Sequence, residues 1–207
     1  MPIDFANAQS TNAKTIPVID VSGAISGDGI NGVADEIYAA AINHGFFYIS
    51  NHGIESALME QAFAVAKAFF ELPESEKQAV AVDKNQRGWL AQGMSRLQGS
   101  KTHDLKEVFF WGTHTAADDA DVLAGKPLCA LNQWPKDFPR LYADLVPYYD
   151  AVCKVARCVM AAVAVSLDQP ANFFDEVYAK PLARGQMVYY PASTARDEAE
   201  ARFGVAP

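Results

Sequence analysis

The sequence predicts an α+β fold in which helices flank a small number of short strands. Apolar residues recur at helical spacing in long segments at residues 31–44, 55–70 and 139–167. Shorter runs rich in β-branched and aromatic residues separate these segments, as is typical of strands. Half of the 207 residues are hydrophobic and 20% are charged, which is the composition of a chain with a packed core.

Two short strands are predicted near the N-terminus. Residues 1–15 are small and polar and are expected to form a loose tail. Residues 16–21 then read as a strand at a sheet edge, because Pro17 lacks an amide hydrogen. A turn follows at residues 26–29. The run at 46–50 is too aromatic and too short for anything but a buried strand.

Two amphipathic helices accompany these strands. The helix predicted at 31–44 ends before Gly45, a residue suited to the C-cap position. Its apolar face consists of Val33, Ile37 and Ala41. The helix predicted at 55–70 carries an apolar stripe of Leu58, Ala62, Val65 and Phe69. Pro73 then opens a short helical turn, since proline is well tolerated at the first helical position.

Beyond residue 80 the chain is expected to alternate strands and loops. Residues 87–89 and 107–111 are predicted strands, and the segment 93–103 between them is a polar loop. We expect residues 116–125 to form an acidic surface loop, since Asp118, Asp119 and Asp121 lie there.

The last elements predicted along the chain are a long helix, a shorter helix and a final strand. The helix at 139–167 contains Pro147, which should kink or divide it. A shorter helix is predicted at 172–178. The strand at 187–190 follows, and we expect it to have no partner strand.

Composition excludes several classes of partner. The formal net charge is −8 and the pI is near 4.9, so we expect neither a nucleic-acid partner nor an anionic membrane surface. The three cysteines, Cys129, Cys153 and Cys158, form no C-x-x-C pair, which favours a reducing, cytoplasmic location over disulfides or structural zinc. The sequence contains no recognisable signal peptide and no apolar run long enough to span a membrane. It does not predict the oligomeric state.

A series of short motifs resembles one known family in combination. In order along the chain they are I-P-V-I-D at 16–20, H-G-F-F-Y-I-S-N-H-G-I at 44–54, F-F-E-L-P at 69–73, R-G-W at 87–89, K-E-V-F-F-W-G at 106–112, N-Q-W-P at 132–135 and Y-Y-P at 189–191. Together they resemble the N-terminal region of the isopenicillin N synthase-like 2-oxoglutarate/Fe(II) dioxygenases.

The resemblance implies a fold and a chemistry. It implies a non-haem dioxygenase N-terminal region at 16–130, long supporting helices at 131–180, and the first part of a jelly-roll (a double-stranded β-helix) at 181–207, left incomplete. It implies Fe(II) and 2-oxoglutarate as cofactors and a small organic molecule as substrate, oxidised with formation of succinate and carbon dioxide. Ethylene-forming relatives are a further option.

The iron ligands of that family are not found in this sequence. They begin as H-x-D just after the Y-Y-P segment, so we expect a chain truncated before the iron motif. None of the four histidines, His44, His52, His103 and His114, begins an H-x-D or H-x-E, and structural roles are expected for all four. No catalytic residue or metal ligand is therefore assigned, and the chain alone is expected to be inactive. The alternative is a non-catalytic truncated gene product or binding module.

Two residues are candidates for ligand contacts. By resemblance, the hydroxyl of Tyr190 would bind 2-oxoglutarate, and the other interpretation is a core tyrosine bonded to backbone. Arg87 is either a substrate-facing cation or a surface arginine before a glycine turn. The nearby aromatic residues are assigned to core packing: Trp89, Phe109, Phe110 and Trp111. Because the strands at 46–48, 108–111 and 187–190 would lack a covering sheet, we expect the isolated chain to be poorly soluble or partly folded.

Overall fold

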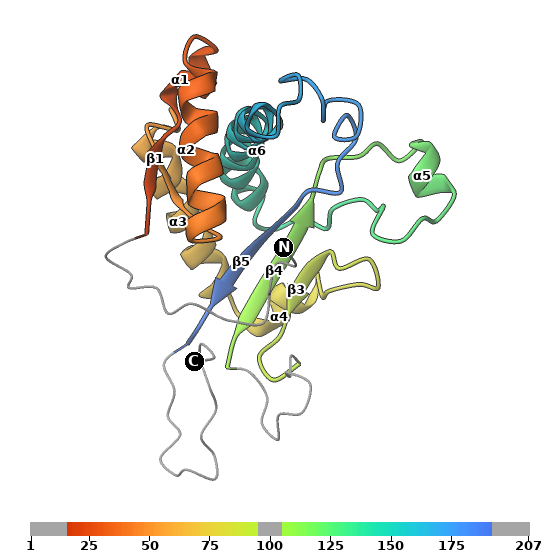
Figure 1. Cartoon of the computed structure of the whole chain (residues 1–207). Coiled ribbons are helices and arrows are strands. Elements are labelled where there is room, and N and C mark those ends of the chain that lie inside the picture. The colour runs from red at the N-terminus through yellow and green to blue at the C-terminus, as the bar shows by residue number, and fades with distance from the viewer. Residues whose placement is uncertain (1–15, 95–104, 192–207) are drawn as a thin grey trace. The chain divides into compact units, whose positions relative to one another are not determined.

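The computed structural model describes residues 16–94 and 105–191, and the chain divides into two compact units (Figure 1). The first unit combines the chain up to Ile54 with Ala151–Ala179, and the second combines Glu55–Asp150 with the chain from Lys180. In the part that the structure describes, no helix is both long and apolar enough to cross a membrane.

The first unit is built on two parallel strands. Strand β1 (Val18–Asp20) pairs with β2 (Tyr48–Ser50), so that Ile19 lies opposite Ile49. Helices α1 (Ser22–Ser26) and α2 (Ile30–Asn43) connect the two strands, and the later part of α6 (Arg140–Ser166) also belongs to this unit. The buried core consists of Ile19, Val21, Ala24, Val33, Ile37, Ala40 and Ala162.

The predicted helix α2 is confirmed, but its C-cap is His44, and Gly45 follows in the next position. Gly45 has a positive φ of 79°, and its amide donates to the carbonyl of Ala40 at 3.1 Å, as in a glycine-terminated helix. The buried alanines of this helix are Ala34 and Ala40, whereas the predicted Ala41 is exposed. Burial of the following strand was also wrongly predicted, since Phe46 is 50% and Tyr48 61% exposed.

The second unit contains an antiparallel sheet of three strands. Strands β3 (Gly88–Leu90), β4 (Glu107–Gly112) and β5 (Arg184–Tyr189) lie in the order β3-β4-β5, side by side in Figure 1. Strand β5 pairs with β4 over six residues, from Glu107↔Tyr189 to Gly112↔Arg184. The final strand therefore has a partner, contrary to the expectation from sequence, because β4 reaches it from more than 70 residues earlier in the chain.

One face of this sheet packs in the core of the second unit. Helix α3 (Ser56–Phe70) supplies the predicted stripe, with Ala62, Val65 and Phe69 buried. Its partners in the core are Trp89, Phe109, Trp111, Leu141, Leu145 and Met187. The aromatic strand at 108–111 is thus covered, which removes part of the reason for expecting poor solubility.

A buried lysine joins this core to the short helix α4 (Glu74–Gln78). The Nζ of Lys77 donates to the carbonyl of Phe70 at 2.9 Å and to Oε2 of Glu107 at 2.7 Å, and the same carboxylate accepts from Nε1 of Trp89 at 2.8 Å. A buried charge must be paired and hydrogen-bonded to be tolerated, and here both conditions hold.

Two of the three remaining segments differ from the sequence predictions, and the third rules out one of two predicted alternatives. The acidic loop contains a short helix, α5 (Ala120–Leu123), with Asp119 as its N-cap. Pro147 lies within α6 but does not divide it. Residues 172–178 form successive turns rather than a helix, with bonds such as Asp175 N–H to the carbonyl of Asn172 that span three residues.

Gly88 is a position where only glycine fits. Its φ is +106°, and a methyl group there would overlap the carbonyl oxygen of Val80. We expect Gly88→Ala to lower the free energy of unfolding by at least ~2 kcal/mol, measured by urea denaturation. The control is Gly32→Ala in α2, where nothing lies within 4 Å and a gain of ~0.5–1 kcal/mol is expected. Equal effects at the two sites would contradict the structure.

Candidate functional site

The second face of the β3-β4-β5 sheet is the candidate site, and we call it the outer face. Side chains alternate along a strand, so the residues between the packed Phe109, Trp111 and Met187 point to the opposite side. By the observed register the outer face comprises Gly88, Leu90, Val108, Phe110, Gly112, Arg184, Gln186 and Val188. On β5 the three outer-face side chains are exposed, which leaves them free to contact a ligand.

Tyr190 continues this alternation beyond the end of β5. Its side chain is 42% exposed, so it is not the buried phenol that the core interpretation requires. Among the described residues its hydroxyl has no hydrogen-bond partner. Pro191 follows directly, and its missing amide hydrogen prevents the ladder from continuing. The phenol is therefore free to bond to a ligand.

Arg87 immediately precedes β3 and is buried rather than at the surface, with only 4% of its area exposed. Its Nη1 donates to the carbonyl of Asn85 at 3.1 Å, and its Nη2 donates to the carbonyl of Leu128 at 2.9 Å. Its Nε is buried without a partner among the described residues. Burial, and then the charge of Arg184, lowers the pKa of Arg87.

Gly112 makes room for the guanidinium of Arg87. A methyl group at Gly112 would overlap Nη2 of Arg87 and lie 2.7 Å from its Cζ, so the guanidinium occupies the space of a side chain at residue 112. The side chain of Asn132 fixes the glycine, accepting from its amide and donating to its carbonyl at 2.8 Å each. The sequence identified Arg87 but not this dependence on a residue 25 positions away.

Arg184 is a candidate site residue that the sequence motifs did not indicate. It lies opposite Gly112 in the register, and its guanidinium is 5.4 Å from the ring centre of Phe110. The strand predicted from the sequence begins at residue 187, whereas β5 begins at Arg184. The alternation of Arg184, Gln186 and Val188 with smaller or apolar neighbours is the signal that could have identified it. Phe110 itself is half-buried on the outer face, whereas Trp89, Phe109 and Trp111 are core residues as predicted.

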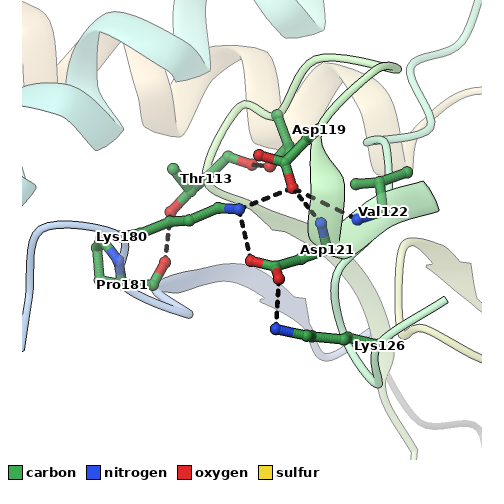
Figure 2. Close-up of polar contacts among 8 residues, drawn as sticks. Thr113, Asp119, Asp121, Val122, Lys126, Lys180 and Pro181 are labelled. Atoms are coloured by element: carbon green, nitrogen blue, oxygen red, sulfur yellow. Dashed lines mark hydrogen bonds and ion pairs between the residues drawn. The ribbon is translucent and has the colours of Figure 1, made fainter. Parts of the chain in front are cut away.

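Polar contacts fix the segment that leads into β5 (Figure 2). The ammonium of Lys180 lies 2.7 Å from Oδ1 of Asp119 and 2.5 Å from Oδ2 of Asp121. The hydroxyl of Thr113 donates to the carbonyl of Pro181 at 3.3 Å, and that of Tyr149 donates to the carbonyl of Ala183 at 2.9 Å. These bonds determine where β5 begins and hence where Arg184 lies.

The same ion pairs shift two pKa values. Hydrogen bonds from Lys126 and then Lys180 lower the pKa of Asp121 to about 2, and bonds to Asp119 and Asp121 raise the pKa of Lys180 to about 12. Because the pKa of Asp121 is depressed, its pairing stabilises the folded chain above the ordinary value of 3.8 and is lost as the pH falls toward 2.

The three histidines that the structure describes are not arranged to bind iron. Nδ1 of His52 accepts from the amide of Ile54 at 3.1 Å, His44 caps α2, and His114 is exposed, while His103 lies outside the described residues. Within residues 16–94 and 105–191, no three His, Cys, Asp or Glu side chains are grouped closely enough to hold a metal ion. These residues therefore do not fit an iron site.

An apolar cavity of about 350 Å³ lies beside α3 and β5. Its lining includes Ala62, Ala66, Phe70, Trp111, Leu145 and Met187. Binding sites usually add a few convergent polar groups to an apolar lining. The charged residue here is Lys67, whose side chain is largely exposed and paired with Glu71. Gln186 lines this cavity as well. The outer face is the stronger candidate because it also presents the exposed, charged side chain of Arg184 on β5.

Comparison with known proteins identifies related chains. The family model described as non-haem dioxygenase in morphine synthesis, N-terminal, matches residues 16–137. The chain is 31% identical over 193 residues to the 2-oxoglutarate-Fe(II) type oxidoreductase hxnY of Emericella nidulans, covering 89% of this chain and 54% of that protein. It is 30% identical over 177 residues to a 2-oxoglutarate-Fe(II) type oxidoreductase of Aspergillus fumigatus, covering 83% and 52%. The chain thus spans about half the length of these curated relatives.

Solved structures agree with the predicted α+β fold. A full-length Neurospora crassa protein in complex with alpha-KG has a TM-score of 0.71 and 25% identity, over 87% of this chain and 56% of that one. A Caulobacter crescentus protein assigned to the 2OG-Fe(II) oxygenase family has a TM-score of 0.76 over 90% and 59% of the two chains, and its 24% identity supports the fold alone. These neighbours have a jelly-roll core, which confirms the predicted fold class.

Removal of Lys180 tests the contacts that position β5. We expect Lys180→Gln to raise the pKa of Asp121 above about 2 while leaving it below 3.8, because Lys126 still donates to that carboxylate. A carboxyl-carbon NMR titration measures this directly. Lys84→Gln, at an exposed lysine without an ion pair among the described residues, is the control and should change nothing. An Asp121 that titrates identically in the parent and the Lys180 variant would refute the pairing.

Proposed function

Because the chain belongs to the non-haem dioxygenase N-terminal family, within the 2-oxoglutarate/Fe(II) dioxygenase superfamily, we propose that it serves an oxygenase that oxidises a small organic substrate. In this proposal 2-oxoglutarate is the co-substrate, converted to succinate and carbon dioxide. The observation that carries the proposal is the family match together with the outer face, whose three side chains on β5 are exposed and include Arg184 and Gln186.

The proposal gives these 207 residues a binding role rather than a metal-ligating one. None of the four histidines begins an H-x-D or H-x-E, so the sequence offers no start for the family's ligand set. A facial set of two histidines and one carboxylate is what a non-haem Fe(II) oxygenase uses. We therefore place oxygen activation outside the chemistry of this chain taken alone, and the chain alone is inactive.

Tyr190 has the 2-oxoglutarate-binding role in this proposal. Its phenol is exposed beside the outer face, and the described residues provide it with no competing partner. A phenol hydroxyl can donate to a carboxylate or keto oxygen, and a hydrogen bond to a charged acceptor contributes about 1.5–3 kcal/mol. Arg87 is buried near Arg184, so in this proposal it supports substrate binding without contacting solvent itself.

The Tyr190 role is tested in a chimera of this chain with the C-terminal half of an oxygenase relative. We expect Tyr190→Phe to raise the KM for 2-oxoglutarate by about 10-fold or more, as loss of such a bond requires, and to leave iron binding unchanged. The matched control is Tyr178→Phe, which removes a similarly exposed phenol from the first unit. If both variants match the parent, the Tyr190 hydroxyl has no part in binding.

The inactive-alone proposal is tested by metal titration of the 207-residue chain. Under anaerobic conditions, calorimetry should show Fe(II) bound no more tightly than by an unrelated acidic protein. A one-to-one site of micromolar affinity or better would contradict this expectation. A non-catalytic binding module is the competing proposal, and the two self-contained cores are the observation in its favour. An active chimera would decide for the oxygenase, and a folded but inactive chimera would decide for the module.

A further inference from the structure

Two arginine side chains lie next to each other on the outer face. The guanidinium of Arg87 occupies the space of a side chain at Gly112, and Arg184 is the residue directly opposite Gly112 on β5. Side chains directly opposite in an antiparallel pair begin about 4.5–5.5 Å apart at Cβ. The two cations are therefore cross-strand neighbours, although Arg87 comes from a different part of the chain.

Neither guanidinium forms an ion pair with the described residues. The acceptors of the Arg87 guanidinium are the carbonyls of Asn85, Gln86 and Leu128, which carry no net charge, and its Nε is buried without a partner in the same part of the chain. The carboxylate of Asp83 accepts from the backbone amide of Arg87 at 2.9 Å and forms no ion pair with its side chain. Arg184 is exposed and forms no ion pair within the part of the chain that the structure describes. Like charges placed opposite each other destabilise a sheet, and a bound anion would remove that repulsion.

The surroundings favour an organic anion. The ring of Phe110 lies beneath the guanidinium of Arg184, and Val188 is exposed further along the same face. Gln186, between Arg184 and Val188 on β5, adds an amide that can donate or accept. A planar guanidinium binds a carboxylate through two parallel hydrogen bonds, and the apolar neighbours suit a hydrocarbon body attached to it.

We propose that Arg184, supported by Arg87, binds a carboxylate group of the substrate, so that the substrate class is an organic acid with an apolar body. Calling this ligand the substrate rests on the proposed function, but the site itself does not. Arg184 and Tyr190 are six residues apart along an extended strand, about 20 Å. The anion at Arg184 is therefore distinct from the 2-oxoglutarate assigned to Tyr190.

The test titrates the full 207-residue chain with 3-phenylpropionate, followed by backbone amide NMR at Gly112 and Gly185. The comparison probes are 3-phenylpropionamide, inorganic phosphate and 2-oxoglutarate. The variants are Arg184→Gln, Arg184→Lys and Gly112→Ala, whose methyl group would displace the Arg87 guanidinium. Arg157→Gln is the matched control, an exposed arginine on α6 in the first unit. A thermal melt confirms that each variant is folded.

We expect the parent chain to bind 3-phenylpropionate saturably and to bind the amide at least 10-fold more weakly. The Arg184→Gln variant should bind 3-phenylpropionate at least 10-fold more weakly than the parent does. Arg184→Lys should bind 3-phenylpropionate several-fold more weakly, because lysine keeps the charge but lacks the planar guanidinium. Gly112→Ala should also bind it several-fold more weakly, and Arg157→Gln should bind it as tightly as the parent. Binding that is equal for acid and amide, or unchanged in Arg184→Gln, overturns the proposal. Phosphate or 2-oxoglutarate binding at these amides as tightly as 3-phenylpropionate overturns the assignment to an organic-acid substrate. The readout is binding without turnover, so a failed oxygenase assay does not affect it.

Discussion

The register between β4 and β5 is the constraint on which the second unit depends. Six residue pairs, from Glu107↔Tyr189 to Gly112↔Arg184, decide which side chains face the core. The side-chain period of a strand is two, so a shift by a single residue would exchange the two faces completely. In the observed register Met187 packs with the aromatic core, and Arg184 and Val188 point to the outer face.

Interactions at both ends of the strands hold this register. At one end, Glu107 accepts from the buried Lys77 and from Trp89, which ties β4 to α4 and β3. At the other end, the amide of Thr113 donates to the carbonyl of Ala183 at 3.1 Å, just before β5 begins. Gly185 completes the fit, since a methyl group there would overlap the ring of Trp111. A glycine is required opposite Trp111, so the sequence itself disfavours any other alignment.

The sequence predicted local features well and long-range features poorly. Helices α2, α3 and α6 follow from periodic apolar residues, and the end of α2 just before Gly45 follows from local backbone preference. The pairing of β4 with β5 joins segments more than 70 residues apart, and no local pattern reports it. The burial of Arg87 likewise depends on the empty side-chain position at Gly112 and on a carbonyl at Leu128. Tyr190 was identified by resemblance to a family motif, whereas its exposure became evident only from the end of β5.

The separation of the two faces links the fold to the proposed chemistry, because the same register covers the core and presents Arg184, Gln186 and Val188. Nuclear Overhauser contacts between β4 and β5 test this register most directly. We expect contacts across β4 and β5 that match the observed pairs, such as Val108 with Val188 or Phe109 with Met187. Contacts of Val108 with Met187 or Tyr189 in their place would show a register shifted by one residue. That result would turn Arg184 toward the core and contradict the outer face as the functional surface.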